Sequence, residues 1–521
     1  MRLAQWMAEQ AGISWAEVLG DASTEAAVSR SKSAGRPREP EADFLSRRKL
    51  LFGALMASTL AQRAAQAAPS TSATRWLINR LTYGWTQAEQ TRADQLGYHG
   101  YLEYQLNHAA IDDSALTQRL IPYLYLRLTP AQLYSISMPS YIIHQVVEST
   151  FIRSVHSKRQ LYQKMVEFWT DHFHISITNE MNAWLRYVDV RDVVMPHALG
   201  KFPDMLNASA RSVPMLLYLN NFENAWWSIN ENYARELLEL HTLGVDGGYT
   251  QQDVMEVARC FTGWGTNGAD GTSNALTFLY YPHKHDNGPK TVLGYTIPAG
   301  GGMNDGQIVL DILANHPSTA QFVSRKLCRR FYDYNPPVSL VNSVAQTYTA
   351  TGGDIKAMLR TLFNSIDPQS APPKLKRPFN LFTSAFRATG ADVVDFPQGW
   401  TTQLRNLMSD CGHQPFHWGP PDGFPESLDF WANLLTPRWA FASTLGSFGM
   451  FQVNFDISVF MSGASSADSM ADRIESRLFP YGMTATEKTL VRDYLAVDPT
   501  SPARQREAVG LAVASPSFQW E

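Results

Sequence analysis

Cysteine is scarce in this chain. Its 521 residues include three cysteines, Cys260, Cys328 and Cys411, and no two of them are closely spaced. This spacing excludes a zinc knuckle and allows at most one disulfide, with one thiol left over. The sequence also lacks a nucleophile elbow, a phosphate-binding loop, a haem-attachment motif and the glycines of a dinucleotide-binding fold.

The chain has no strong excess of charge and no basic stripe. Its formal net charge is −4 at pH 7. A general polyanion-binding protein carries a clear positive patch, so no nucleic-acid partner is expected. The hydrophobic fraction of 44% and the charged fraction of 18% are those of a globular protein, which excludes wholesale disorder.

The apolar run near the N-terminus is too short to span a bilayer comfortably. It covers about a dozen residues, 50–61, and follows the twin arginines Arg47 and Arg48. A small-x-small cleavage pattern follows at 65–67. Residues 46–68 therefore predict an export signal of the twin-arginine type, the alternative being an amphipathic or buried helix with a chance arginine pair.

Export defines the expected organisation and location of the chain. Residues 1–45 are predicted to be a poorly structured extension, because 29–40 is rich in Ser, Lys, Arg, Gly and Pro. The mature protein is expected to be periplasmic or secreted, with no transmembrane span. The twin-arginine route carries folded proteins, often with a cofactor already loaded, and this favours a metal or redox site.

Residues 73–521 predict a mainly α fold, a single large multi-helical domain without repeats or a long linker. Apolar residues recur at helical spacing through most of this range. The exception is a small β-hairpin insert near 276–297. There, 276–281 and 291–297 are β-prone and are expected to pair as antiparallel strands around a turn.

The densest run of chemically capable residues is 230–250. Ser228 and Glu231 fit a capping box at its start, and Glu231 stands four residues before Arg235 in the favourable order for an ion pair. His241 falls in the last turn, where the helix dipole favours a cation. Gly244 suits the cap that ends the helix.

A polar stripe remains on this helix after those local roles are assigned. Asn232, Arg235, Glu236 and Glu239 share one face. One interpretation is a solvated helix face. The other makes Arg235, Glu236 and Glu239 catalytic: the two glutamates act as acid and base or share a metal, and Arg235 orients a carboxylate or binds an anionic substrate.

Histidines elsewhere in the chain supply the remaining candidate ligands. His283 and His285 alternate on an expected hairpin and so face the same side, with Asp286 beside them. A polar turn explains the same residues, and His172 among aromatic residues is explained equally by a hydrogen-bonded core position. The predicted metal ligands are His172, Glu236, His283, His285 and Asp286, and the expected ion is a divalent or transition metal.

Several runs together resemble the domain-of-unknown-function 1800 family. They are 161–173, 230–264, 285–291, 316–320 with 325–327, and 420–425, and they follow the family's order across nearly all of the mature chain. The resemblance implies an exported bacterial protein without an established reaction. It also implies, as a partner, a co-encoded exported protein of sulfatase-like fold. In the family the first run usually carries two histidines, at the positions of Thr170 and His172 here, and this chain keeps the second.

The resulting functional expectation is an exported protein that carries out a metal-assisted redox or hydrolytic reaction at a carboxylate and histidine site. Arg235, Glu236 and Glu239 are expected to meet His172 and the turn at 285–286. The alternative is a non-enzymatic envelope or matrix protein. In that case the charged helix is an ion-pair scaffold, and the protein binds a protein partner, or a glycan through surface tryptophans.

Overall fold

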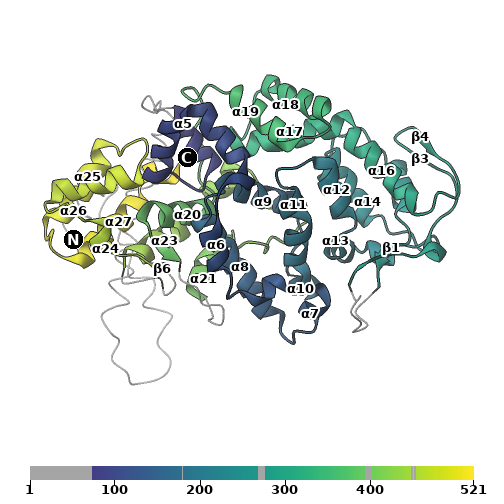
Figure 1. Ribbon diagram of the computed structural model, residues 1–521, viewed down its shortest axis with the longest axis horizontal. Coiled ribbons are helices and arrows are strands. Elements are labelled where there is room, and N and C mark those ends of the chain that lie inside the picture. The colour runs from purple at the N-terminus through teal and green to yellow at the C-terminus, as the bar shows by residue number, and fades with distance from the viewer. Residues whose placement is uncertain (1–72, 179, 268–275, 394–401, 448–449, 451–452) are drawn as a thin grey trace, which may run out of the picture.

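The computed structural model describes residues 73–178, 180–267, 276–393, 402–447, 450 and 453–521. The predicted extension at 1–45 and the predicted export signal at 46–68 lie outside the described residues. Helices dominate, as predicted, and the strands form short antiparallel pairs (Figure 1). Within the described ranges, no helix has both the length and the apolar character needed to cross a membrane.

The elements before residue 300 are mostly short helices. They are α4 (Ala73–Leu81), α5 (Gln87–Leu106), η2 (His108–Ala110), α6 (Ser114–Arg119), η3 (Leu124–Arg127), α7 (Pro130–Tyr134), α8 (Pro139–His156), α9 (Gln160–His172), α10 (Glu180–Asp189), η4 (Val190–Val194), α11 (Met195–His197), α12 (Phe202–Ala210), α13 (Val213–Tyr218), η5 (Asn221–Glu223), α14 (Asn232–Glu236), η6 (Leu237–Thr242), α15 (Gln251–Cys260), β1 (Trp264–Thr266), β2 (Phe278–Tyr280), η7 (Pro282–Lys284), β3 (Lys290–Val292) and β4 (Tyr295–Ile297). Of these, η4 and η6 are π-helical.

The elements after residue 300 are helical apart from one strand pair. They are α16 (Met303–Asn315), α17 (Pro317–Phe331), α18 (Val338–Thr351), α19 (Ile355–Asn364), α20 (Pro378–Thr389), β5 (Asp392–Val393), α21 (Thr402–Asp410), α22 (Leu428–Ala432), α23 (Leu435–Gly446), β6 (Val453–Asn454), α24 (Ile457–Phe460), α25 (Ala467–Leu478), α26 (Ala485–Ala496), α27 (Pro502–Ala514) and α28 (Pro516–Gln519).

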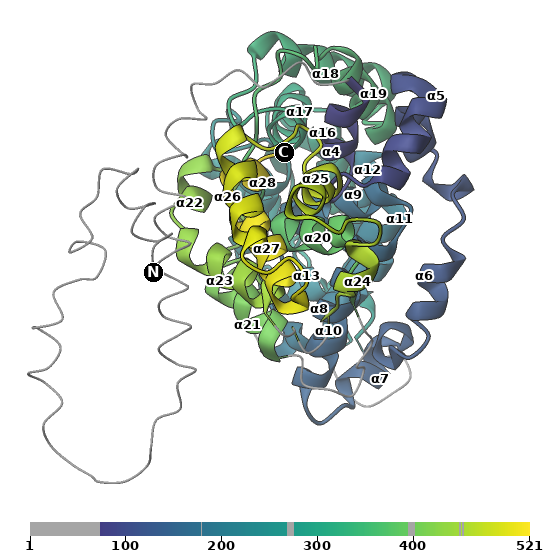
Figure 2. The same cartoon turned by 90° about the vertical axis from the view of Figure 1, so that its left-hand side faces the viewer.

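The helices are arranged along one long axis. Figure 1 shows α25, α26 and α27 at one end and α16 with the β3–β4 pair at the other, with α9 and α20 between them. The end view in Figure 2 places α27 in front of α20. One continuous apolar core runs from Trp76 to Phe518. A smaller cluster of Leu375, Phe424 and Trp431 underlies the loop at 420–427.

The β-insert contains a hairpin, but its strands pair differently from the prediction. Residues 276–281 and 291–297 do not pair with each other: β2 pairs with β1, and β3 pairs with β4. The reason is the turn between Val292 and Tyr295. Leu293 and Gly294 both have positive φ, 50° and 82°, which is the two-residue hairpin geometry that folds 290–297 back on itself.

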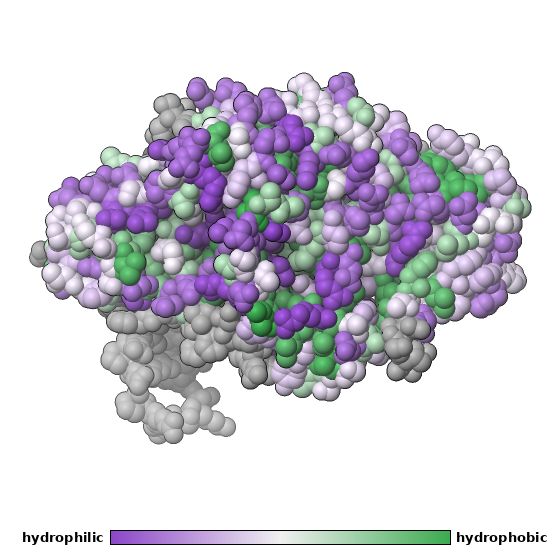
Figure 3. Space-filling model, viewed as in Figure 1, coloured by the Kyte–Doolittle hydropathy of each residue, from purple (hydrophilic) through white to green (hydrophobic). Residues whose placement is uncertain are grey.

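The surface is mixed in polarity. Figure 3 shows hydrophilic residues over most of the visible face, and hydrophobic residues gathered in the region of α7 and α10. Large apolar side chains that are exposed near this region include Ile121, Leu124 and Met138. A separate exposed pair, Trp226 and Trp227, lies in the loop between α13 and α14, with 58% and 57% of their surfaces accessible.

Candidate functional site

Helix α9 carries charged side chains into the interior. Lys164, Glu167 and Asp171 follow at spacings of three and four, so they share one face of the helix. Lys164 is buried, and the two carboxylates keep 13% and 17% of their side-chain surface. Buried charges require partners, so this face of α9 locates a polar centre in the fold.

The loop at 420–427 covers the end of α9. Gly423 has a φ of +75°, and a Cβ built on it would lie 2.1 Å from the Asp171 carbonyl oxygen. Only glycine combines this backbone conformation with this approach. The close contact places Asp422 and Glu426, on either side of the glycine, beside the polar face of α9.

A cage of ion pairs holds Glu426 in place. Its Oε1 lies 2.7 Å from Arg330 Nη1 and 3.1 Å from Arg377 Nη1, and its Oε2 lies 3.5 Å from Lys374 Nζ. Burial opposes the charged carboxylate, yet these three cations hold the pKa of Glu426 below its ordinary value. Arg330 also reaches Glu167, at 2.9 Å. Each of these charges has an opposite charge beside it, so we infer that the cage holds α9, α17 and the loop together.

Asp171 behaves differently from the carboxylates of the cage. Its Oδ2 accepts a hydrogen bond from Arg377 Nη2 at 2.9 Å. Burial nevertheless raises the pKa of Asp171 to about 6, and the Arg377 guanidinium only partly offsets that effect. A carboxyl group with a pKa near neutrality is suited to donating and accepting protons.

A cavity of about 270 Å³ lies between α9, α17 and the loop. Asp171, His172, Lys326, Arg329 and Glu426 are among the residues that line it. Its volume lies just below the range of about 300–1,000 Å³ that is usual for small-molecule sites. Asp171 therefore projects into a space that a small ligand would fill.

Lys326 and Arg329 bring two positive charges to the lining of the cavity. They stand three residues apart on α17, so they share a face. Within the described residues, neither side chain has a carboxylate within 4.0 Å. Burial lowers the pKa of Lys326 to about 8, although the nearby charge of Asp171 acts in the opposite direction.

His172 forms a buried pair with His241. His172 Nε2 lies 3.1 Å from the His241 carbonyl oxygen and donates to it, and the ring centroids are 6.2 Å apart. Each ring has a second nitrogen, His172 Nδ1 and His241 Nε2, without a hydrogen-bond partner among the described residues. Burial lowers the pKa of both rings, to about 3 for His241, so both are neutral.

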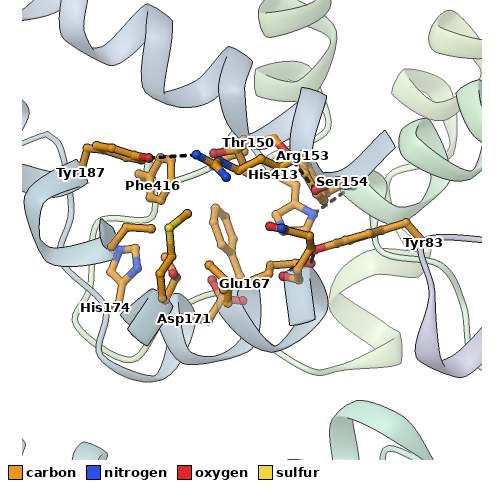
Figure 4. Close-up of a pocket in the computed structure, with 18 residues that line it drawn as sticks. Tyr83, Thr150, Arg153, Ser154, Glu167, Asp171, His174, Tyr187, His413 and Phe416 are labelled. Atoms are coloured by element: carbon orange, nitrogen blue, oxygen red, sulfur yellow. Dashed lines mark hydrogen bonds between the residues drawn. The ribbon is translucent and has the colours of Figure 1, made fainter. Parts of the chain in front are cut away.

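A second, smaller cavity of about 50 Å³ lies on the other side of Asp171 (Figure 4). Figure 4 shows Glu167, Asp171 and His174 projecting from neighbouring positions of one chain segment, with Tyr83 donating to Glu167 at 2.7 Å. Arg153 donates to the Tyr187 hydroxyl at 3.2 Å. This cavity has room for water molecules only.

The three predicted catalytic residues lie on α14 and η6, at the edge of this region. Arg235 donates to Glu231 at 3.0 Å, as the sequence order predicted. Burial and then the neighbouring Glu239 raise the pKa of Glu236, and Asp422 of the cavity loop adds to the effect. Glu239 accepts from the Tyr249 hydroxyl at 3.4 Å. None of the three is among the residues that line the cavity, and Glu236 is close enough to Asp422 for their charges to interact.

Two local predictions for this helix were wrong. Ser228 does not cap it; Ser228 forms a β-bridge with Ala225, and α14 begins at Asn232. His241 does lie in the last turn, as predicted, but burial lowers its pKa to about 3, so it is not a cation there. The helix becomes π-helical at Leu237, which turns His241 into the core, where it is 1% exposed.

The five predicted metal ligands are not brought together. No group of three or more His, Cys, Asp or Glu side chains in the described ranges is arranged to hold a metal ion. His285 is buried between Thr262 and Asp305, with its Nε2 3.2 Å from Asp305 Oδ2. Asp286 accepts from Arg259 at 2.7 Å, and His283 is exposed. These contacts attach the insert to α15 and α16, while His172 pairs with His241 and Glu236 lies on α14.

Sequence reasoning missed most of the cavity. Asp171, Lys326 and Gly423 all fall inside the runs that resemble the family, which was the available signal. None of them was singled out, because each has an ordinary local explanation in its own segment. Their place in the candidate site depends on contacts between segments that are distant in the sequence. Arg377 and Asp171 are 206 residues apart, and Arg330 and Glu426 are 96 residues apart.

Comparison with known proteins agrees with the resemblance of the sequence. No curated protein and no solved structure matches the chain significantly. A family model described as "Protein of unknown function (DUF1800)" matches residues 76–520. That range contains α9, α17 and the loop at 420–427, and so the whole candidate site. The chain therefore belongs to the DUF1800 family.

Proposed function

We propose that this protein is an enzyme that binds a small anionic substrate in the cavity between α9, α17 and the loop at 420–427. Lys326 and Arg329 bind the anionic group of the substrate. Asp171 transfers a proton to or from the reacting part, as in a hydrolytic or elimination reaction. The proposal moves the predicted carboxylate and histidine site from α14 to α9.

One observation carries the proposal: two cations that have no carboxylate within 4.0 Å among the described residues line a cavity beside a carboxyl group whose pKa is about 6. Most other buried cations near the cavity have partners. Arg330 contacts Glu167 and Glu426, and Lys374 contacts Glu426. Lys326 and Arg329 therefore remain available for a ligand, and charge-assisted hydrogen bonds to an anion are the strong class of such contacts.

Anion binding is the first experiment. Calorimetric titration of the full chain with phosphate, sulfate and small carboxylates is expected to find at least one ligand. Lys326→Met and Arg329→Met should each weaken its binding about ten-fold or more, since a lost charge-assisted contact costs about 1.5 kcal/mol. Lys158→Met is the matched control, because Lys158 is exposed and is not among the residues that line the cavity. Equal affinity in all variants contradicts the proposal.

Proton transfer is tested separately with Asp171→Asn. This variant keeps the shape of the side chain but removes its acid–base function. It is expected to bind the anion and to lose turnover in a screen of small anionic esters and hydroxy acids. Full turnover by Asp171→Asn would assign the chemistry to another group.

We also propose that the protein acts outside the cytoplasm, in the periplasm or as a secreted protein. The support is the twin-arginine pattern at 47–48, the apolar run at 50–61 and the cleavage pattern at 65–67. Replacement of Arg47 and Arg48 by Lys should retain the protein in the cytoplasm. Unchanged export of that variant would refute the twin-arginine route.

Metal assistance is a separate part of the proposal, and elemental analysis tests it. His172 and His241 offer two unpaired imidazole nitrogens, fewer than the three protein ligands of most catalytic zinc sites. Proton transfer by Asp171 is therefore the favoured chemistry. Stoichiometric metal in exported protein, lost in His172→Phe, would instead establish a metal-assisted reaction.

A second candidate function is binding of a glycan or of a protein partner, such as the co-encoded sulfatase-like protein. The observation in its favour is the exposed pair Trp226 and Trp227, whose ring centroids are 5.5 Å apart. Exposed tryptophans are common anchors of binding surfaces. Loss of partner or glycan binding in Trp226→Ala with Trp227→Ala, and no effect of Lys326→Met, would favour this function.

A further inference from the structure

We propose that Lys326 is a nucleophile, and that its amine forms an imine with an aldehyde or ketone that carries an anionic group. This inference rests on the proposed function and names its substrate class. In it, Arg329 is the principal anchor of the anion, and Lys326 is the reacting group.

The surroundings of Lys326 favour a free amine over a fixed ammonium. Its Nζ lies 5.5 Å from the centroid of the Phe322 ring, which lines the same cavity. Two other buried lysines are bound to oxygen atoms: Lys374 Nζ lies 2.6 Å from the Arg329 carbonyl, and Lys290 Nζ lies 2.6 Å from Asp305. No carboxylate in the described part of the chain approaches Lys326 to that distance. Its nitrogen therefore faces the cavity.

The ionisation of Lys326 is consistent with this role. Burial lowers its pKa to about 8, so about a tenth of the side chain is neutral at pH 7. An exposed lysine has roughly a hundred times less free amine at that pH. Lysines desolvated in this way are typical amine nucleophiles toward carbonyl compounds.

The reaction balances with the groups present in the cavity. The amine nitrogen attacks the carbonyl carbon, a C–N bond forms, and the carbonyl oxygen receives the electron pair. The nitrogen loses one proton to the Asp171 carboxylate, and Asp171 passes that proton to the oxygen, which gives a carbinolamine. Asp171 moves the second nitrogen proton to the hydroxyl group in the same way, and the C–O bond breaks to release water as the C=N bond forms. Asp171 lines the same cavity, and its pKa of about 6 allows both directions of transfer.

Arg329 defines the second requirement on the substrate. It lies three residues after Lys326 on α17 and lines the cavity. Its Nε has no hydrogen-bond partner among the residues that the structure describes, and its Nη2 donates to the Glu426 carbonyl at 2.7 Å. This anchored guanidinium is suited to a carboxylate or phosphate close to the reacting carbonyl.

The test is imine trapping on the full chain with pyridoxal 5′-phosphate, an aldehyde with an anionic group. After reduction with borohydride, peptide mapping is expected to find Lys326 modified at least about ten-fold more than the exposed Lys158, given its larger free-amine fraction. Lys326→Arg should lose this modification while retaining the charge. Arg329→Met should reduce modification by pyridoxal 5′-phosphate and leave that by pyridoxal unchanged.

Lys376 is the internal control for the effect of a lowered pKa alone. Burial lowers its pKa to about 7, and its Nζ lies 3.9 Å from the Phe518 ring centroid, but it lines neither cavity. Modification of Lys376 and Lys158 to the same extent as Lys326 would overturn the inference. Anion binding that depends on Arg329, without any imine at Lys326, would refute the inference and leave the proposed function standing. Absence of both would refute the two together.

Discussion

Gly423 is pressed against Asp171, with its Cα so close that an added Cβ would stand 2.1 Å from the Asp171 carbonyl oxygen. The contact joins the loop at 420–427 to the last turn of α9. It positions Asp422 and Phe424 at the cavity and brings Glu426 to its cations. The candidate site therefore depends on the absence of a side chain at one position.

Gly423→Ala is expected to destabilise the protein by about 3 kcal/mol. The positive φ costs about 1–2 kcal/mol for a non-glycine residue, and the clash with backbone adds an overpacking cost of about 1–3 kcal/mol. Urea unfolding measures the change. Gly412→Ala is the matched control: Gly412 has a φ of +62°, but its added Cβ would meet nothing closer than 4.0 Å. Equal losses in the two variants would show that the contact with Asp171 is unimportant.

Glu426→Gln is expected to cost about 3–5 kcal/mol, because it leaves Arg330, Arg377 and Lys374 without their shared buried anion. The comparison is Glu231→Gln, which breaks the more exposed pair with Arg235 and should cost less than about 1 kcal/mol. Both values follow from chemical denaturation at pH 7. A small loss for Glu426→Gln would mean that the cage does not hold the loop.

The stability contributed by Asp171 should decrease as the pH rises. Its pKa in the folded protein is about 6, above the unfolded value of about 3.9, so the folded protein retains this proton to higher pH. The contribution is fully present below about pH 4 and is lost through pH 6, by up to about 3 kcal/mol. Denaturation of the wild type and of Asp171→Asn between pH 4 and 7 measures it. A constant difference between them would contradict the raised pKa.

Lys326→Met is expected to stabilise the protein, by up to about 1 kcal/mol at pH 7, while weakening anion binding. The substitution replaces a desolvated cation that has no carboxylate partner within the described residues. Lys374→Met should do the opposite and cost about 3 kcal/mol, because Lys374 is bound to Glu426 and to the Arg329 carbonyl. Thermal unfolding of both variants shows whether each substitution raises or lowers the stability of the protein. Destabilisation by Lys326→Met would assign Lys326 a structural role.

Local patterns in the sequence correctly predicted features that depend only on residues close together in the chain. Helical spacing located most of the helices, and the capping box of Thr250 and Asp253 is a feature of the same local kind. Arg235 pairs with Glu231 four residues earlier, also as predicted. The prediction that Ser228 caps the helix was wrong because a contact outside its segment determines its conformation. The amide of Trp226 donates to the Lys284 carbonyl, and residues 225–228 form a β-bridge beside this contact.

The cavity could not be predicted from local sequence patterns, for a related reason. A lysine in a helix and an aspartate near a helix end have ordinary local explanations, so Lys326 and Asp171 gave no separate signal. What distinguishes these two residues is their shifted pKa values, which result from desolvation and from neighbouring charges. Packing between distant segments determines both causes. The runs that resemble the family include the segments that form the cavity, but the resemblance does not indicate which of their side chains line it.

The π-helical segment η6 affects how relatives of this chain should be aligned. Its bonds join residues five apart: the Leu243 amide donates to the Leu238 carbonyl at 2.8 Å, and the Thr242 hydroxyl to the Leu237 carbonyl at 2.5 Å. Such a segment is equivalent to one extra residue inserted into an α-helix. Deleting one residue there would rotate His241 by about 100° away from His172. Relatives with a one-residue gap in this segment are therefore expected to have lost the histidine pair, even where a histidine is aligned with His241.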